Sequence, residues 1–448
     1  MREKETAEKI AFLVSEAGGC AYYVGGYVRD RMLGIESKDI DIEIHGIEEK
    51  RLAEVLSDAG RIYSKGAGFS VYGISGCDLD IALPRRESKN GRGHRGFDVF
   101  SDPYIGEKKA CLRRDFTVNA MMENVLTGDI LDYCGGLDDL EKGIIRHVSS
   151  MSFSDDPLRV VRMAAFCARL GFEPAEETLR LSESADISEL PRERIEGELM
   201  KVLTGSERPS VFFEILKRIR KLSFWFPEIE ALSGIPQNPE HHPEGDVWNH
   251  TMMVLDEASK LRADAWYPEG FMMAALMHDI GKSVTTFTGE DGRIRSIGHE
   301  KCLEEVRRAM HRITGEKKLI SYVVNMTALH MRPNQLAKFN SGQKAINRLF
   351  DSSCSPRDLI LLSKADFLGR ADAPDYAPTE EYLHRGYDSF CSIMDKPYVK
   401  GEDLIAAGIT PGPEMGKLLK SAHSMRLAGM NREKVLKELG ISDNGKGH

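Results

Sequence analysis

The spacing of apolar and polar positions changes once along the chain. Over residues 1 to about 150, short runs that alternate apolar and polar positions interchange with stretches of helical periodicity. Segment 38–44 shows the alternation most strictly, with isoleucine at every second position from Ile40. This mixture of periods predicts an α/β unit in which a sheet and helices pack on one another.

From about residue 151 the apolar positions follow helical spacing, with few strand signals. The proline-rich segment 235–243 predicts a linker, and residues 245 to about 375 again show a helical pattern. We therefore expect four parts, which are an α/β head with a mixed sheet over 1–150, an all-α neck over 151–235, an all-α domain over 241–375 and a helical tail over 376–448.

Composition narrows the class of protein. Hydrophobic residues make up 41% of the chain, but no apolar run approaches the ~20 residues that a membrane helix needs. The N-terminus is charged and lacks the apolar core of a secretory signal. The eight cysteines contain no Cys-x-x-Cys pair, which favours reduced thiols over a disulfide or zinc framework. We expect a cytoplasmic protein with no membrane partner.

Charge limits how the chain can bind nucleic acid. The chain has 61 basic and 70 acidic residues, a formal net charge of −9, so its surface cannot be uniformly cationic. RNA binding must use local basic patches, for which segments 85–95 and 217–221 are candidates. Taken alone, each of these segments is more typical of a solvated surface than of an RNA-binding site.

The first candidate site begins where an apolar strand meets two glycines, Gly25 and Gly26, and then a helix. Bare backbone N–H groups at such a turn suit a triphosphate, although a tight turn alone would look the same. Asp39 and Asp41 follow, on the same face of the alternating strand. Two carboxylates aimed at one point are what Mg²⁺ ions need in phosphoryl transfer.

The alternative for this acidic alternation is a solvated strand face, and the upstream glycine pair favours the metal site. Asp80, in the alternating segment 78–83, is the candidate third carboxylate, with a surface role left open. Downstream, Arg113 and Arg114 offer fixed guanidinium forks for triphosphate oxygens, or a surface ion pair.

These motifs resemble the class II CCA-adding tRNA nucleotidyltransferases and the bacterial poly(A) polymerases, which share a nucleotidyltransferase head. Segment 25–30 with the Asp-x-Asp strand matches the first family motif, and segment 112–121 matches the Arg-Arg-Asp motif. The resemblance implies that Asp39, Asp41 and Asp80 are catalytic and that Asp39 and Asp41 bind Mg²⁺. It implies nucleotide-binding roles for Gly25, Gly26, Arg29, Arg113, Arg114, Asp115, Asn119, Asp156, Arg159 and Arg162.

Asp156 and Arg159 lie three residues apart on a predicted helix and are therefore neighbours. An acceptor beside a donor matches the pairing edges of both cytosine and adenine, at ~1–3 kcal/mol per contact by analogy with base readout in DNA. The alternative for Asp156, which precedes Pro157, is a helix N-cap. The segment resembles the family's Glu-Asp-x-x-Arg motif, with Asp155 in place of Glu. Segment 84–97 aligns with the loop that in CCA-adding relatives helps switch from C to A addition, although an ordinary mobile loop would look the same.

A second, independent constellation surrounds the string His278-Asp279-Ile280-Gly281-Lys282. His278 and Asp279 are adjacent on a helix, so both can lean onto one metal. The string resembles the HD phosphohydrolases, whose ligand pattern maps here to His250, His278, Asp279 and Asp366. His299 and His330 would allow a second metal. Imidazole and carboxylate ligands suit Mn²⁺, Fe²⁺, Ni²⁺ or Zn²⁺.

The family resemblance implies a tRNA nucleotidyltransferase that adds CMP and AMP to the tRNA 3′ end, from CTP and ATP, with a phosphohydrolase domain behind it. A poly(A) polymerase or an A-adding enzyme is the nearest alternative, because these enzymes share the head. A phosphodiesterase with a degenerate RNA-binding head is a second alternative, and a purely structural metal in the HD domain is a third.

Overall fold

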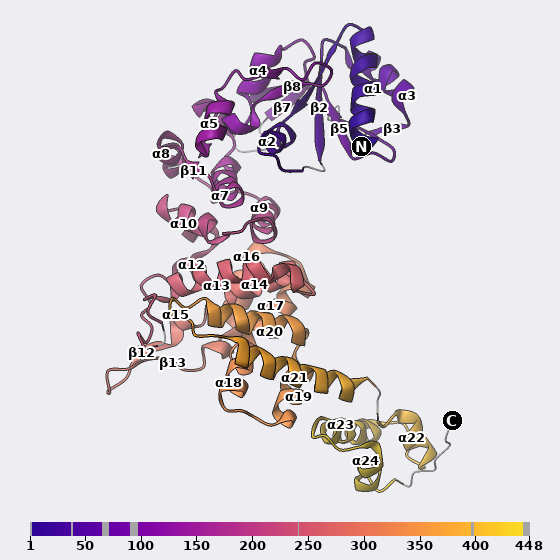
Figure 1. The fold of residues 1–448 in the computed structure, drawn as a ribbon, viewed down its shortest axis with the longest axis vertical. Coiled ribbons are helices and arrows are strands. Elements are labelled where there is room, and N and C mark those ends of the chain that lie inside the picture. Colours follow the sequence, from indigo (N-terminus) through magenta and orange to yellow (C-terminus); the bar gives the residue numbers. More distant parts are fainter. Residues whose placement is uncertain are drawn as a thin grey trace. The chain divides into compact units, whose positions relative to one another are not determined.

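The computed structural model describes residues 2–36, 39–64, 71–89, 97–240, 242–395 and 398–441. The chain divides into two compact units, and we describe each by itself. Unit 1 comprises residues 1–198 and 211–221, and unit 2 comprises residues 199–210 and 222–448. Figure 1 shows a sheet with covering helices in the first and a stack of helices in the second. The four-part division expected from the sequence stays a prediction.

A seven-stranded sheet forms the centre of unit 1, in the order β3-β4-β5-β2-β1-β8-β9. Its strands are β1 (Cys20–Val24), β2 (Ile40–His45), β3 (Ile62–Ser64), β4 (Val71–Ile74), β5 (Leu79–Ala82), β8 (Met122–Asn124) and β9 (Ile130–Leu131). Strands β2 and β5 pair in parallel, and the other neighbours pair antiparallel. The sheet is therefore mixed, as the sequence predicts.

Helices and two small sheets complete unit 1 around this sheet. The helices are α1 (Arg2–Glu16), α2 (Gly26–Met32), α3 (Glu49–Ala59), α4 (Glu107–Leu112), α5 (Gly136–Lys142), α6 (Ser150–Asp155), α7 (Leu158–Leu170), α8 (Glu176–Ser184) and α10 (Ser210–Arg218), with α9 (Arg192–Gly205) shared between the units. The small sheets pair β6 (Arg85–Lys89) with β7 (Phe97–Ser101) and β10 (Ile144–Ile145) with β11 (Glu173–Pro174).

The alternation in β2 fixes which side chains enter the core. Ile40, Ile42 and Ile44 are buried, with exposed fractions of 5% or less, because side chains two apart share one face of a strand. The other face carries Asp41 and Glu43, and this is the face on which the candidate chemistry lies. The segment proposed as a C-to-A switching loop, 84–97, contains β6 and the first residue of β7, and its residues 90–96 lie outside the described part of the chain.

In its described residues, unit 2 is helical apart from a short hairpin of β12 (Thr286–Thr288) and β13 (Ile294–Ser296) and an isolated bridge between Pro236 and Asp246. Its longer helices are α13 (Val247–Leu261), α14 (Pro268–Met277), α16 (Leu303–Ile313), α17 (Lys317–Leu329), α19 (Gln343–Ser352), α20 (Pro356–Leu368), α21 (Ala377–Met394) and α23 (Pro413–Leu427). The shorter ones are α11 (Leu222–Trp225), α12 (Pro227–Glu230), α15 (Lys282–Thr285), α18 (Arg332–Lys338), α22 (Gly401–Ala406) and α24 (Arg432–Glu438). The predicted succession of a mixed α/β head and helical parts is confirmed.

Helix α14 lies at the centre of unit 2, because every residue of Gly270–Met277 is buried and the helix packs against α13, α17 and α20. A helix that is apolar on all sides is stable only inside a core. His278 and Asp279 follow directly at its end. A buried helix therefore positions the two residues on which the second candidate site depends.

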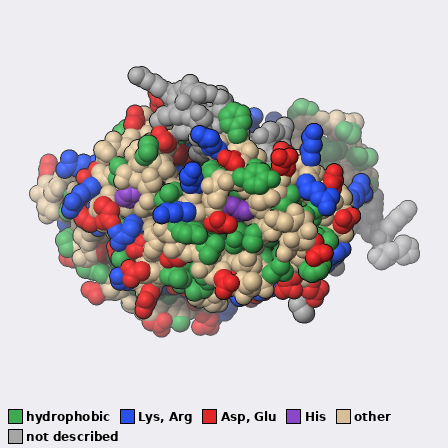
Figure 2. All heavy atoms as spheres, turned by 90° about the horizontal axis from the view of Figure 1, so that it is seen from above, with side chains coloured by type: hydrophobic (Ala, Val, Ile, Leu, Met, Phe, Trp, Pro, Cys, Tyr) green, Lys and Arg blue, Asp and Glu red, His purple; other side chains and the backbone are tan. Residues whose placement is uncertain are grey.

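The cysteines, the surface charges and the helix lengths all bear on the class of protein. All eight cysteines are free, as expected without a disulfide framework. In the face drawn in Figure 2, basic and acidic side chains are interspersed. No helix within the described ranges is both long and apolar enough to cross a membrane.

Candidate active sites

The sheet of unit 1 brings two of the three predicted catalytic aspartates together. Asp41 in β2 and Asp80 in β5 are partners in the parallel register, so their side chains leave the same face of neighbouring strands. Asp41 is exposed and Asp80 is half-buried, which leaves the carboxylates open to a ligand. Asp39 is exposed and lies one residue before β2 begins.

The glycine turn lies beside these carboxylates. Gly25 has a φ of 71°, a left-handed conformation that favours glycine. A Cβ atom at Gly25 would lie 3.4 Å from Nη1 of Arg114 and 3.6 Å from Oδ2 of Asp41. The turn, an acidic residue of β2 and an arginine of the Arg-Arg-Asp motif therefore converge on one point, as the sequence predicts for a triphosphate site.

Both arginines of that motif share one partner, Glu43 of β2. Nη2 of Arg113 and Nη2 of Arg114 donate to Oε2 of Glu43 at 3.3 and 3.2 Å. The Glu43 side chain is buried, whereas the arginine side chains are 27% and 18% exposed, so this is not the surface ion pair considered as the alternative. Burial alone would raise the pKa of Glu43, but a hydrogen bond with His45 and the charges of Arg114 and Arg113 outweigh it and lower the pKa to about 2.

A second network joins the remaining residues of the two motifs. Buried Arg29 donates to Oδ1 of Asp30 and, at 2.6 Å, to Oδ1 of Asn119. Asn119 donates to Oδ1 of Asp115 at 3.1 Å, and Arg162 donates to Oδ2 of Asp115 at 2.9 and 2.6 Å. These residues therefore form a connected, largely buried framework behind the site, and we predict that they position it.

The guanidinium groups of Arg29 and Arg162 each lie 5.2 Å from the centre of the Phe166 ring. Phe166 is itself buried, with 7% exposed, so both cations lie against a buried aromatic ring. Cation–π contacts of this kind stabilise a partly desolvated arginine. The helix α7 that carries Phe166 is thereby fastened to the head's first motif.

Asp156 and Arg159 are held by different partners. Asp156 accepts from Arg194 at 3.2 and 3.0 Å and from the backbone N–H of Leu158, as a capping side chain does. Arg159 donates to the backbone carbonyls of Arg114 at 3.1 Å and Arg113 at 2.7 Å. Both side chains are part-buried, and their predicted role in base selection stays a prediction.

In unit 2 the structure brings the predicted His and Asp residues into one buried cluster. Nε2 of His250 lies 3.1 Å from Oδ1 of Asp366, and Nε2 of His278 lies 3.2 Å from Oδ2 of Asp279. Nε2 of His299 lies 3.2 Å from Oδ1 of Asp279 and 3.4 Å from Nε2 of His330. Two triads have ligand atoms within 4.8 Å of one another, and these are His250, His278 and Asp279, and Asp279, His299 and His330.

The histidines of this cluster are oriented for a metal. Nδ1 of His278, His299 and His330 lies within 2.8 Å of the carbonyl oxygen of the residue three positions earlier, so Nδ1 carries the proton and Nε2 offers its lone pair. Nε2 of His278 is buried, and its 3.2 Å approach to Oδ2 of Asp279 does not have the geometry of a hydrogen bond. A buried acceptor of this kind is costly unless something binds it, and a divalent metal would do so.

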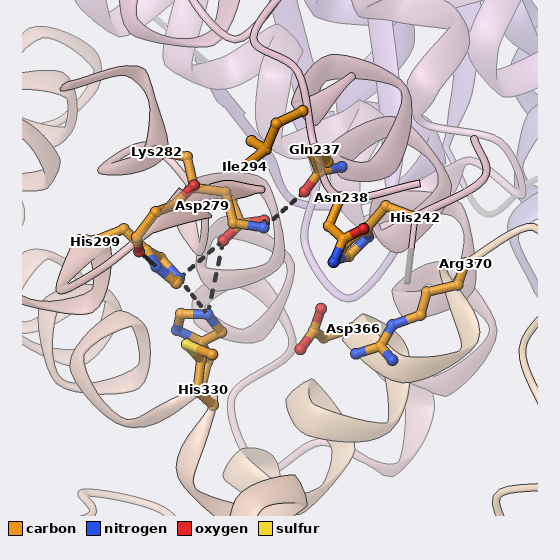
Figure 3. Close-up of a pocket in the computed structure, with 12 residues that line it drawn as sticks. Gln237, Asn238, His242, Asp279, Lys282, Ile294, His299, His330, Asp366 and Arg370 are labelled. Atoms are coloured by element: carbon orange, nitrogen blue, oxygen red, sulfur yellow. Dashed lines mark hydrogen bonds and ion pairs between the residues drawn. The ribbon is translucent and has the colours of Figure 1, made fainter. Parts of the chain in front are cut away.

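The proline-rich segment, which the sequence analysis interprets as a linker, forms one wall of the pocket at this cluster (Figure 3). The pocket, of about 240 Å³, is lined by Gln237, Asn238, His242, Asp279, Lys282, Ile294, Ser296, His299, His330, Met331, Asp366 and Arg370. The sequence analysis missed His242 and Arg370. His242 lies eight residues before His250 in the sequence. That spacing alone does not identify His242 as part of the site, because its place in the pocket depends on the fold.

Glu244 is a further residue that the sequence analysis missed. Its Oε1 lies 2.9 Å from Nδ1 of His250 and 2.9 Å from Nδ1 of His242. A carboxylate behind a histidine fixes the ring and increases its basicity toward a metal on the other nitrogen. The three residues form a further group with metal-ligand spacing.

Known proteins are similar to this chain both in the head and along most of its length. Residues 21–146 match the family model described as the poly A polymerase head domain. The chain is 36% identical over 400 residues to the multifunctional CCA protein of Tolumonas auensis, covering 85% of this chain and 92% of the relative. It is 39% identical over 413 residues to that of Pseudomonas fluorescens, covering 89% and 95%.

Solved structures share the fold along most of the chain. A CCA-adding enzyme in its first apo form superposes with a TM-score of 0.66 at 22% identity, covering 99% of this chain and 95% of the other. The Thermotoga maritima CCA-adding enzyme in complex with tRNA gives a TM-score of 0.61 at 21% identity, covering 97% and 94%. The sequence identity to the two bacterial relatives, over most of both chains, shows that this protein belongs to the family of multifunctional CCA proteins.

Proposed function

We propose that unit 1 adds CMP and AMP to the 3′ end of tRNA, with CTP and ATP as substrates. The observation that carries the proposal is the convergence of Asp41, the Gly25 turn and Arg114 on one point, with Asp80 opposite Asp41 on the neighbouring strand. Family membership supports it, since relatives with this architecture are multifunctional CCA proteins. Structures of similar fold have been solved with tRNA, ATP and CTP.

The residues around that point fit a magnesium-dependent transfer. Two or three carboxylates on one open sheet face are the donor set that Mg²⁺ prefers, with room left for phosphate oxygens. Mg²⁺ held by Asp39, Asp41 and Asp80 would supply the charge that favours ionisation of the tRNA 3′-hydroxyl and departure of pyrophosphate. Arg113 and Arg114 then bind triphosphate oxygens, and the turn at Gly25 lets the backbone approach them.

Asp156 and Arg159 are proposed to select the base. An accepting carboxylate and a donating guanidinium complement cytosine and adenine and oppose guanine and uracil. Because Arg159 also donates to the carbonyls of Arg113 and Arg114, its position is tied to that of the phosphate-binding pair.

The test uses purified protein, Mg²⁺ and tRNA transcripts that lack CCA, end in C or end in CC. Supplied with CTP and ATP, the protein should extend all three to CCA and then stop, as read on a sequencing gel. Addition of A to the CC-ended transcript alone would identify an A-adding enzyme instead. Long A tails on unrelated RNA would identify a poly(A) polymerase, and no incorporation would contradict the proposal.

We propose a second activity for unit 2, the metal-dependent hydrolysis of phosphate esters, 2′,3′-cyclic RNA ends among them. The buried cluster of His250, His278, Asp279 and Asp366 supports it, with His299 and His330 completing a second triad. Imidazole with carboxylate suits Mn²⁺, Fe²⁺, Ni²⁺ or Zn²⁺. Such a metal would supply a nucleophilic water at neutral pH. The pocket beside the cluster offers room for the ester.

Arg370 is the residue that we propose to bind the phosphate in this pocket. Of the two pocket cations, Lys282 is ion-paired to Asp279 at 2.6 Å, while Nε of Arg370 is buried without a hydrogen-bond partner. The Phe367 ring, 5.1 Å from its guanidinium carbon, holds the side chain. Figure 3 shows Arg370 beside Asp366 at the pocket's edge.

Replacement of Arg370 tests this assignment. A charged hydrogen bond contributes about 1.5–3 kcal/mol, so Arg370→Gln should raise KM for a phosphate ester by roughly 10- to 100-fold, with Arg370→Lys intermediate. Arg385→Gln, at an exposed arginine of α21, is the control and should behave like wild type. An unchanged KM in Arg370→Gln would show that Arg370 does not bind the phosphate. The assignment of the metal ligands would still stand, and loss of activity in Asp279→Ala tests it separately.

A further inference from the structure

Strand β2 places three ionisable side chains in a row. Asp41, Glu43 and His45 occupy alternate positions and so share one face of the strand, with Asp41 exposed and the other two buried. Glu43 is 3% exposed and His45 is 4% exposed. The role of Asp41 follows from its place in the site, but a buried carboxylate and a buried histidine behind it are unexplained by metal binding.

The two oxygens of the Glu43 carboxylate have different hydrogen-bond partners. Oε1 lies 3.0 Å from Nε2 of His45, and Oε2 accepts from both Arg113 and Arg114. The His45 ring in turn packs edge-on against Tyr22 of β1, with ring centres 5.5 Å apart. The carboxylate is therefore fixed in orientation by a group that does not itself reach the arginines.

We propose that Glu43, oriented by His45, is a positioning residue that sets the two arginines in their phosphate-binding geometry before the nucleotide arrives.

Arg114 shows how this works. Its Nη2 is bonded to Glu43, while its Nη1 lies 3.4 Å from the Cβ position of Gly25, beside Oδ2 of Asp41. One end of the planar guanidinium is thus fastened to the strand, and the other end lies at the turn where the triphosphate is expected. A group held in this way loses less freedom when the ligand binds, which increases affinity.

The backbone of the same pair is fixed from another element. Arg159 of α7 donates to the carbonyl oxygens of both Arg113 and Arg114. Glu43 therefore restrains the side chains while Arg159 restrains the main chain. Removing either restraint should leave arginines that are present but poorly placed, which weakens nucleotide binding without removing a catalytic group.

The alternative is that Glu43 merely neutralises charge so that the sheet folds. The chain offers a matched control in Glu123 of β8, which is also 3% exposed, lies in the same sheet and is ion-paired with an arginine, Arg31. Glu123 and Arg31 lie outside both family motifs, which are segment 25–30 with the Asp-x-Asp strand and the Arg-Arg-Asp segment 112–121. Both glutamates should cost stability when replaced, but only Glu43 should affect the nucleotide.

The experiment compares Glu43→Gln, Glu43→Asp, His45→Gln and Glu123→Gln with the full-length wild type. Thermal melting reports folding. The affinity for ATP and CTP, measured at equilibrium without Mg²⁺, reports how well the arginines bind the triphosphate when no reaction takes place. Steady-state kinetics then separate KM from kcat. We expect Glu43→Gln to weaken binding and raise KM about tenfold, or about 1.4 kcal/mol, with a smaller change in kcat. We expect a smaller loss for Glu43→Asp and His45→Gln, and wild-type binding for Glu123→Gln.

Two results would overturn the inference. One is wild-type nucleotide affinity in a folded Glu43 variant, and the other is an equal loss of affinity in Glu123→Gln. If Glu43→Gln does not fold, Glu43→Asp and His45→Gln carry the same comparison. The inference rests on nucleotide binding by unit 1, so a wild type that binds neither ATP nor CTP would contradict it. A wild type that binds nucleotide but adds nothing to tRNA would contradict only the proposed function.

Discussion

The two candidate sites use aspartates in opposite ways. In unit 1, Asp41 is exposed on an open sheet face, next to a glycine turn and two arginines. In unit 2, Asp279 is 1% exposed and surrounded by histidines whose orientation the backbone fixes. An open carboxylate set would leave room for the substrate's phosphates on a bound metal, whereas the buried set would offer a metal histidine and carboxylate ligands from the chain itself. We infer that the first metal arrives with the nucleotide and that the second resides in the protein.

The largest effect is expected at the open site. Asp41→Asn keeps the shape of the side chain but removes its charge, which is worth several kcal/mol in a metal-assisted transfer. Because about 1.4 kcal/mol is a factor of ten in rate, nucleotide incorporation should fall at least ~100-fold.

Asp138→Asn, at an exposed aspartate ion-paired with Lys142, is the control and should retain full incorporation. Wild-type incorporation by folded Asp41→Asn would show that the carboxylates of β2 are not the reacting set.

Metal retention should separate the two sites next. After brief dialysis against a chelator, we expect elemental analysis to find a transition metal still bound to the wild type and Mg²⁺ removed. His278→Ala, which deletes the buried nitrogen that lacks a hydrogen-bond partner, should lose that metal.

The metal should also stabilise the fold. A ligand at a hundredfold excess over its Kd adds about 2.7 kcal/mol to the free energy of unfolding. Wild type stripped of its metal by prolonged chelation should therefore melt at a lower temperature and recover when metal is added, whereas His278→Ala should not respond. A wild type that takes up no metal, and melts identically with and without it, would contradict a resident metal.

A smaller effect is expected from packing behind the buried cluster. The carbonyl of Gly369 lies 3.2 Å from Nδ1 of His250, and a Cβ at Gly369 would lie 2.4 Å from Cγ2 of Val254 and 2.8 Å from its backbone. Gly369→Ala should therefore reduce the free energy of unfolding by about 1–3 kcal/mol and weaken metal binding.

Gly342→Ala is the matched control, because nothing lies within 4 Å of its Cβ position. Equal stability of the two variants in denaturant titrations would show that the cluster does not depend on this contact.

The sequence predicted those parts of the molecule that depend on local spacing. The period of two in β2 gives both the buried isoleucines and the outward Asp41, and helical spacing gives the long helices of unit 2. The register that places Asp80 opposite Asp41 is not visible in a single sequence, because it depends on pairing between strands about 40 residues apart.

What the sequence analysis missed are contacts between distant segments. Glu43 carries no signal of its own in the sequence, because its arginine partners follow 70 and 71 positions later. The prolines of segment 235–243 predict a linker because they report local breaks in structure, not where the loop lies. Its place on the pocket wall, with His242 and then Glu244 behind His250, follows from the fold.

We propose that this one chain carries two separate phosphate chemistries, each with its own metal set. The most direct test measures Asp41→Asn and Asp279→Asn in both assays, CCA addition to tRNA and hydrolysis of a 2′,3′-cyclic phosphate. We predict that Asp41→Asn loses only CCA addition and that Asp279→Asn loses only hydrolysis. Loss of both activities in either folded variant, or full hydrolysis by Asp279→Asn, would contradict the account.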